Sequence, residues 1–130
     1  MVIDSSALLA ILFGEPESGR LKLAMANSGQ FRMSAVNWLE AMMVLESRRG
    51  VDSTDDLETS LDELSVQIVP FDHRHMEEAR EAWRRFGKGR HPAGLNMADC
   101  AAYATAVLAG EPLLFKGDDF SRTGIPAVEW

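Results

Sequence analysis

Four carboxylates stand in otherwise apolar stretches of the chain, where charged side chains are uncommon. They are Asp4, Glu40, Asp99 and Asp118. Acidic side chains are seldom buried unless they are paired with a cation or bound to a metal. Hard divalent cations such as Mg²⁺ and Mn²⁺ prefer oxygen ligands, and a cation held by carboxylates can activate water against a phosphate. If the fold brings the four acids together, they predict metal-dependent hydrolysis of phosphodiester bonds.

Short apolar strands alternate with helices along the chain. Strands are expected at residues 2–4, 30–34, 66–69 and 113–115, with a last short edge strand at 127–129. Helices are expected at residues 7–13, from 16 to about Asn27, and at 35–49, 53–64, 73–86 and 97–109. This alternation predicts an α/β fold with a parallel sheet covered by helices on both faces. A length of 130 residues suits a single domain, which we expect to span residues 1–130.

Residues that commonly begin helices mark several of these boundaries. Ser5–Ser6 and Ser34 precede two of the expected helices, and Asp72 precedes another. Ser53 and Asp56 resemble a capping box, with Asp in the place of the usual Glu. Pro16 is suited to the first turn of a helix. These signals predict where the helices begin and therefore which residues leave the strands.

Two of the four acids follow expected strands. Ligands of parallel sheets bind beyond the carboxyl ends of the strands, so Asp4 and Asp118 are expected to lie on the same edge. Taken singly, Asp4 is as well explained by capping the next helix, unless Ser5 or Ser6 caps it instead. Asp118 and Asp119 follow a glycine, and either could belong to a turn. The position nearer the strand, Asp118, is preferred as the residue that faces the site.

The other two acids lie on expected helices. Glu40 has mostly apolar neighbours at helical spacing, where a carboxylate needs a partner. The alternative to a functional role is a buried ion pair with Arg32 or Arg48. Asp99 is the third residue of its helix if Asn96 is the cap, and it would then stabilise the helix dipole. That helix contains no other charge between residues 96 and 110 and looks buried, which favours delivery of the carboxylate into a cleft.

The bulk properties restrict the class of protein. The chain is 46% hydrophobic and 25% charged, and its single cysteine excludes an internal disulfide framework. The amino terminus lacks the features of a secretory signal, and no apolar stretch is long enough to span a bilayer. We therefore expect a cytoplasmic protein. The formal net charge of −7 is unusual for a nucleic-acid binder, but the acids cluster locally, and a divalent cation would neutralise part of that charge.

One basic segment stands out against the negative net charge. Residues 84–91 contain four of the thirteen lysines and arginines, namely Arg84, Arg85, Lys88 and Arg90. These side chains could bind the phosphates of a nucleic acid next to an acidic cleft. They could equally stabilise the carboxyl end of the preceding helix, where cations are favourable.

The motifs that carry these residues resemble PIN-domain ribonuclease toxins of the VapC type. The resemblance covers Val2–Leu12, Ser34–Glu40, Gly87–Cys100 and Leu113–Phe120, in family order and spacing and over nearly the whole chain. The third and fourth motifs are the most specific. One departure is Ala98, where relatives often have glycine before the acid; an added methyl group should leave the chemistry intact.

The resemblance implies a three-layer α/β/α fold with about four to five parallel strands and an endoribonuclease that depends on Mg²⁺ or Mn²⁺. It implies Asp4 and Asp99 as the principal metal ligands, with Glu40 and Asp118 completing the acidic cluster. It also assigns Ser6 a place in the site, hydrogen-bonded near the first acid. Transfer RNA and ribosomal RNA are both expected as substrate classes.

The resemblance also implies protein partners. A cognate VapB-type antitoxin would neutralise the chain, and toxin homodimers would form within a larger toxin–antitoxin assembly. The amino-terminal helices have more apolar surface than one narrow face needs, and a groove left exposed among them would suit an amphipathic antitoxin helix. Two other functions compete: a non-catalytic interaction module, in which the acids are caps and turns, and a metal-dependent phosphohydrolase acting on another substrate.

Overall fold

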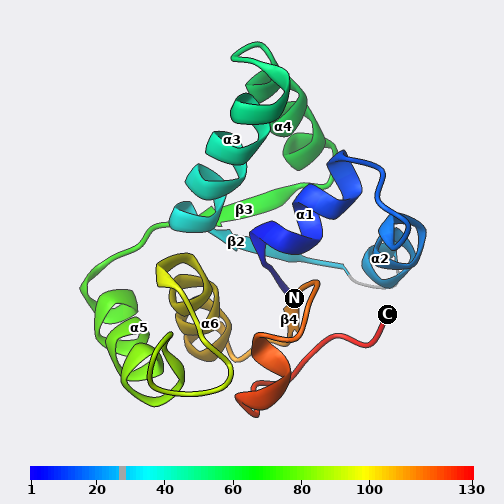
Figure 1. Cartoon of the computed structure of the whole chain (residues 1–130). Coiled ribbons are helices and arrows are strands. Elements are labelled where there is room, and N and C mark those ends of the chain that lie inside the picture. Colours follow the sequence, from blue (N-terminus) through cyan, green and yellow to red (C-terminus); the bar gives the residue numbers. More distant parts are fainter. Residues whose placement is uncertain (27–28) are drawn as a thin grey trace.

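A parallel sheet with the strand order β3-β2-β1-β4 forms the centre of the computed structural model, which describes residues 1–26 and 29–130 (Figure 1). The strands are β1 (Val2–Ile3), β2 (Phe31–Ser34), β3 (Val66–Val69) and β4 (Leu113–Leu114). The helices are α1 (Ser5–Leu12), α2 (Ser18–Ala26), α3 (Ala35–Arg49), α4 (Ser53–Glu63), α5 (His73–Phe86), α6 (Met97–Ala109) and a 3-10 turn, η1 (Phe120–Arg122). The predicted α/β class with a short parallel sheet is confirmed.

The path of the chain changes direction after β3. Strands β1, β2 and β3 follow one another outward across the sheet, and β4 then returns to the free side of β1. Helices α1, α3 and α4 consequently lie on one face, with α2 beside them, whereas α5 and α6 lie on the other (Figure 1). The reversal falls between β1 and β4, and this is where open parallel sheets place their ligands.

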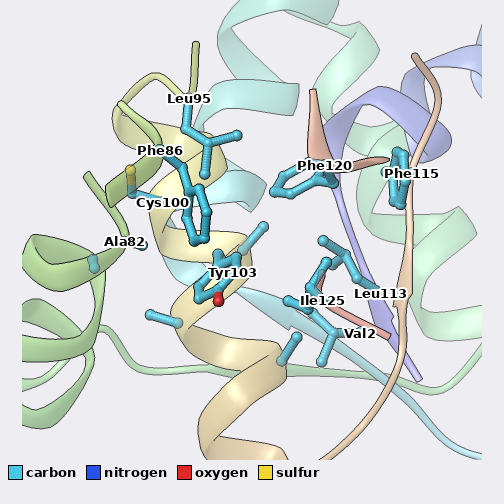
Figure 2. Close-up of a cluster of buried hydrophobic side chains, with 14 of the residues drawn as sticks. Val2, Ala82, Phe86, Leu95, Cys100, Tyr103, Leu113, Phe115, Phe120 and Ile125 are labelled. Atoms are coloured by element: carbon cyan, nitrogen blue, oxygen red, sulfur yellow. The ribbon is translucent and has the colours of Figure 1, made fainter. Parts of the chain in front are cut away.

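Two buried clusters hold the layers together, and the strands divide their side chains between them. Val2 and Leu113 point into the cluster under α5 and α6, whereas Ile3 and Leu114 point into the cluster under α1 to α4. The alternation that a strand imposes on successive side chains thus holds even for strands of two residues. Figure 2 shows the first cluster, in which Tyr103 of α6 lies among side chains from α5, β4 and the carboxyl-terminal segment.

Three boundaries differ from those predicted. Of the two caps considered for α1, the structure has Asp4, whose side chain accepts from the amide of Ser6, and not Ser5 or Ser6. The capping box predicted at Ser53 is wrong, because that hydroxyl donates back to the carbonyl of Gly50 at 2.6 Å. Helix α2 begins at Ser18 rather than Pro16, since the residues between form a turn.

Two further expectations concern segment ends. The predicted strand at 127–129 is reduced to one bridge, between Leu113 and Ala127, because the segment leaves the sheet edge after that pair. The predicted end of the second helix, Asn27, lies outside the described residues. None of the helices in the described ranges is long and apolar enough to span a membrane.

Burial within α2 yields a matched test of the fold. Leu21 is 0% exposed, whereas Leu23, two residues later on the same helix, is 65% exposed. We expect Leu21→Ala to lower the free energy of unfolding by about 2–5 kcal/mol, because it removes buried methyl groups and leaves a cavity. Leu23→Ala should change it by less than about 0.5 kcal/mol. Urea unfolding of both variants measures the difference, and equal losses would contradict the packing described for this helix.

Candidate active site

The first turns of three helices meet at the carboxyl edge of β1 and β2. Helix α1 follows β1 at once, α3 follows β2 with Ser34 as its cap, and α6 enters the same region from the opposite face of the sheet (Figure 1). A helix amino terminus has a partial positive charge of about half an elementary charge. This edge therefore favours negative groups, and three of the four predicted acids lie on or beside these three turns.

Asp4 is the most deeply buried of the acids, with 2% of its surface exposed. Its Oδ2 accepts from the amide of Ser6 at 2.9 Å and from the Ser6 hydroxyl at 2.5 Å. Its Oδ1 accepts from Nδ2 of Asn37 at 2.9 Å. Burial raises the pKa of Asp4 to about 7, and the negative charges of Asp99 and Glu40 act in the same direction, while the Ser6 hydrogen bonds oppose them. The residue thus caps α1 and also faces the other acids.

Asp99 closes a capping box at the start of α6. Its Oδ2 accepts from the amide of Asn96 at 2.8 Å, and its own amide donates to the Asn96 side chain at 2.9 Å. Partial burial raises the pKa of Asp99, and the charges of Asp119 and Glu40 raise it further. Asp99 therefore takes part in capping α6, which was one of the roles expected from the sequence. The cap also fixes its carboxylate near the other acids.

Glu40 accepts a hydrogen bond from a serine hydroxyl. It does not form the ion pair with Arg32 or Arg48 that was the alternative to a functional role. The hydroxyl of Ser5 donates to Oε2 of Glu40, which leaves the other carboxylate oxygen available. Arg32 is paired with Glu111, and the guanidinium of Arg48 lies over the ring of Phe13. Since neither arginine neutralises Glu40, its negative charge remains part of the acid cluster.

Asp118 and Asp119 lie in the turn after β4, and both are exposed. The carbonyl of Asp118 accepts from the amide and the hydroxyl of Ser121, at 3.2 and 2.6 Å, which closes the turn. It is the charge of Asp119 that acts on the pKa of Asp99. The role predicted for Asp118 stays a prediction, and the electrostatic coupling favours its neighbour as the fourth acid of the cluster.

Three contributors were not identified in the sequence. Asn37 is 0% exposed and bonds to Asp4 and to the carbonyl of Ala98. Ser5 holds Glu40, and the amide of Lys116 donates to the Ser6 hydroxyl at 3.0 Å, which ties the end of β4 to the start of α1. The sequence feature that could have pointed to Asn37 is its position: it places an amide on a mostly apolar helix face, one turn before Glu40.

The donor set suits a hard divalent cation. Carboxylate oxygens and water are the ligands that Mg²⁺ and Mn²⁺ accept, and Mg²⁺ uses few carboxylates directly. In residues 1–26 and 29–130, no three His, Cys, Asp or Glu side chains lie together in a group that could hold a metal ion. The arrangement instead fits two close carboxylates, Asp4 and Asp99, with the outer acids acting through water. A cation would also offset the burial and the neighbouring negative charges that raise the pKa values of Asp4 and Asp99.

The basic segment forms a closed loop between α5 and α6. The loop begins at Gly87, where a Cβ would lie 2.4 Å from the carbonyl of Trp83, and it ends at buried Leu95. The guanidinium of Arg90 lies 4.1 Å from the centre of the Trp83 ring, and Arg84 is paired with Glu81 at 2.9 Å. The segment therefore stabilises the end of α5, and its predicted binding to phosphates stays a prediction.

An apolar groove lies away from the acids, among α1, α2 and α4. It has a volume of about 510 Å³, and its lining residues include Ile11, Leu12, Met25, Phe31 and Leu64. Three polar side chains, Lys22, Ser60 and Glu63, also line it, and the two charged ones are exposed. The sequence predicted apolar surface on α1 and α2, and the structure adds α4 as the third wall.

Comparison with known proteins identifies the family to which this fold belongs. The family model described as PIN domain matches residues 1–126. The chain is 47% identical over 128 residues to Ribonuclease VapC of Mycolicibacterium smegmatis, and the match covers 98% of this chain and 99% of that one.

Two solved structures share the fold at low sequence identity. The crystal structure of VapC20 of Mycobacterium tuberculosis, described as a sarcin-ricin loop cleaving toxin, superposes with a TM-score of 0.77 at 19% identity, covering 99% of this chain and 98% of that one. VapBC2 from Rickettsia felis, bound to a DNA fragment from its promoter, gives 0.72 at 14% identity, with 98% and 96% covered. The chain therefore belongs to the PIN-domain family and, within it, to the VapC ribonucleases.

The raised pKa of Asp4 predicts a pH-dependent stability in the metal-free protein. Between pH 3.8, the ordinary pKa of an aspartate, and about pH 7, Asp4 retains a proton in the folded state that it has lost in the unfolded chain. The proton on Asp4 therefore stabilises the folded state fully below this pH range, and the stabilisation is lost as the pH rises through it. The free energy of unfolding falls by at most about 1.4 kcal/mol per pH unit. We expect Asp4→Asn to abolish this part of the slope.

Urea unfolding in chelator at several pH values from 4 to 8 measures this effect as the difference between wild type and Asp4→Asn. The difference removes the contributions of all other titrating groups, because both proteins share them. Parallel stability curves for the two proteins would contradict the shifted pKa.

Proposed function

We propose that this chain is the toxic component of a type II toxin–antitoxin system and that it hydrolyses phosphodiester bonds within RNA using a divalent metal ion. The observation that carries the proposal is the electrostatic coupling of Asp4, Glu40, Asp99 and Asp119 at one edge of the sheet. Membership of the VapC ribonucleases supports the reaction class. A set of independent caps and turns would not bring four carboxylates from different elements into mutual repulsion.

Three of the acids have distinct parts in the proposed reaction. Asp4 and Asp99 hold the cation, because each has one side fixed by a helix cap and burial raises the pKa of both. Glu40, held through one oxygen by Ser5, orients the attacking water with the other oxygen. When bound, the cation lowers the pKa of that water and neutralises charge on the phosphate oxygens. Ser6 keeps Asp4 in its rotamer through two hydrogen bonds.

The proposed cation is Mg²⁺, with Mn²⁺ as a substitute. Both accept carboxylate and water oxygens in an octahedral arrangement, and the absence of His and Cys from the four-acid cluster argues against a preference for zinc. Raised carboxyl pKa values mean that protons compete with the cation, so binding should strengthen as the pH rises toward 7.

The proposed substrate is a folded cellular RNA, either transfer RNA or ribosomal RNA. VapC20, which shares the fold, is described as cleaving the sarcin-ricin loop. Arg84, Arg85, Lys88 and Arg90 are proposed to bind phosphates on either side of the cleaved bond, because their loop leads directly into the first turn of α6, which carries Asp99. Sequencing the ends of RNA fragments would assign the target.

The proposed partner is a VapB-type antitoxin, with toxin homodimers inside the complex. A structure with the same fold was solved as a VapBC assembly. The apolar groove among α1, α2 and α4 has the shape and chemistry that an amphipathic helix recognises, with a mostly apolar lining and two exposed charged side chains. We place the protein in the cytoplasm as a single domain over residues 1–130, which the unpaired Cys100 and the family match to residues 1–126 support.

Cleavage of total cellular RNA tests the proposal directly. Purified protein freed of any partner should cut RNA at a few sites with Mg²⁺ or Mn²⁺ and should not cut it in chelator. Asp4→Asn and Asp99→Asn should each reduce the rate by about 100-fold or more, because loss of a direct ligand costs at least as much as loss of an outer one. Wild-type rates in either variant would overturn the assignment.

A matched pair separates the two acids after β4. Asp119→Asn should slow cleavage more than Asp118→Asn, since it is Asp119 whose charge acts on Asp99. The reverse order would restore Asp118 as the fourth acid. If folded, metal-loaded wild type cuts no RNA pool, the chain acts as an interaction module.

The basic loop predicts a salt-dependent affinity. In an Asp99→Asn background, which prevents cleavage, Arg85→Ala with Lys88→Ala should flatten the plot of log affinity against log salt by about 0.7–0.9 for each phosphate that is no longer bound. The matched control is Arg74→Ala with Arg80→Ala, which removes the same charge from exposed positions of α5. Equal slopes for the two double variants, measured by fluorescence anisotropy, would remove the loop from the RNA-binding surface.

A further inference from the structure

The amide of Asn37 joins the two segments that carry the proposed metal ligands, Asp4 and Asp99. Its Nδ2 donates to Oδ1 of Asp4 at 2.9 Å and to the carbonyl of Ala98 at 3.2 Å. Ala98 directly precedes Asp99 in the first turn of α6. Asn37 itself belongs to α3 and is 0% exposed, so both hydrogen bonds are shielded from water. One side chain thus connects the end of β1, the start of α3 and the start of α6.

We propose that Asn37 is a positioning residue for the metal site, which fixes the carboxylate of Asp4 relative to Asp99 and leaves one defined lone pair of Asp4 for the cation. The inference rests on the metal site proposed above and deepens it. It concerns a residue that neither binds the cation directly nor belongs to the acid cluster.

A count of lone pairs on Asp4 supports this role. An ionised carboxylate has about four lone-pair sites, two on each oxygen. Both sites on Oδ2 are used by Ser6, through its amide and its hydroxyl. One site on Oδ1 is used by Asn37. The remaining site, on Oδ1, is the one that can face a cation, so Asn37, together with Ser6, sets the direction in which the carboxylate can bind.

The other end of the amide gives a second, independent indication. Oδ1 of Asn37 is buried and has no hydrogen-bond donor among the described residues. Buried amide oxygens are almost always satisfied, by protein groups or by water. This oxygen can therefore accept a hydrogen bond from a water molecule that binds next to the Asn37 amide. A purely structural tie between α3 and α6 would require only the bond to Ala98.

Manganese binding distinguishes a positioning role from a structural one. Mn²⁺ affinity can be measured by the electron paramagnetic resonance signal of the free ion, without RNA. We expect Asn37→Leu, which has a similar volume and no donor, to weaken Mn²⁺ binding by about 10–100-fold, as is typical when a group that orients a ligand is removed. The matched control is Thr105→Val in α6, which removes a buried hydroxyl bonded only to the carbonyl of Ala101. It should lower the melting temperature and leave Mn²⁺ affinity unchanged.

A measurement on the wild type keeps the test decisive if Asn37→Leu does not fold. In protein labelled with ¹⁵N, the side-chain amide signal of Asn37 should shift when Mg²⁺ is added. The amide of Gln67, on β3 and away from the acids, should not shift. A signal of Asn37 that stays in place while Mg²⁺ binds would overturn the inference.

The outcomes separate this inference from the function on which it rests. If the wild type binds Mn²⁺ and folded Asn37→Leu binds it equally well, Asn37 is structural and the proposed ribonuclease site stands. If the wild type binds no Mn²⁺, the metal site itself is wrong and the inference falls with it. Weaker binding in Asn37→Leu alone, with Thr105→Val unaffected, supports the positioning role.

Discussion

The structure is organised around the cost of burying the negative charge of Asp4. A buried carboxylate without compensation would protonate, and burial raises the pKa of this residue to about 7. The protein reduces the cost with three hydrogen bonds, two from Ser6 and one from Asn37, and with the positive ends of three helices that meet at the same edge. The compensation is incomplete, since Glu40 and Asp99 add repulsion. That remaining unfavourable energy is what a divalent cation can relieve.

The topology explains why this compensation occurs at a single place. Because the chain reverses direction after β3, α6 packs on the face opposite α1 and α3, and its first turn returns to the edge where those two helices begin. Acids from both faces of the sheet then approach one another across the end of β1. Had the fourth strand continued outward beyond β3, α6 would pack on the same face as α1 and α3 but further across the sheet, and Asp99 would lie away from Asp4.

The elements and the residue types of the site could be predicted from the sequence, but the contacts between elements could not. Apolar periodicity and turn residues identified the strands and helices, and isolated acids in apolar stretches identified Asp4, Glu40 and Asp99. The errors concern choices among adjacent polar residues. Asp4 and the serines after it are all good caps, so local preference did not decide between them. The role of Asn37 depends on its hydrogen bond to α6, far away in sequence, which spacing along one helix does not reveal.

The distance along the chain between the parts of the site has a consequence during protein synthesis. The end of β1 emerges from the ribosome first, but it is tied to β4 by the bond between Ser6 and Lys116, and Asp119 follows β4 near the carboxyl end. Because domains fold as units once their strands are available, a nascent chain that lacks β4 has no assembled acid cluster. A polypeptide that has been translated only as far as α6 is therefore inert, and the acid cluster can assemble only after β4 and Asp119 have been made.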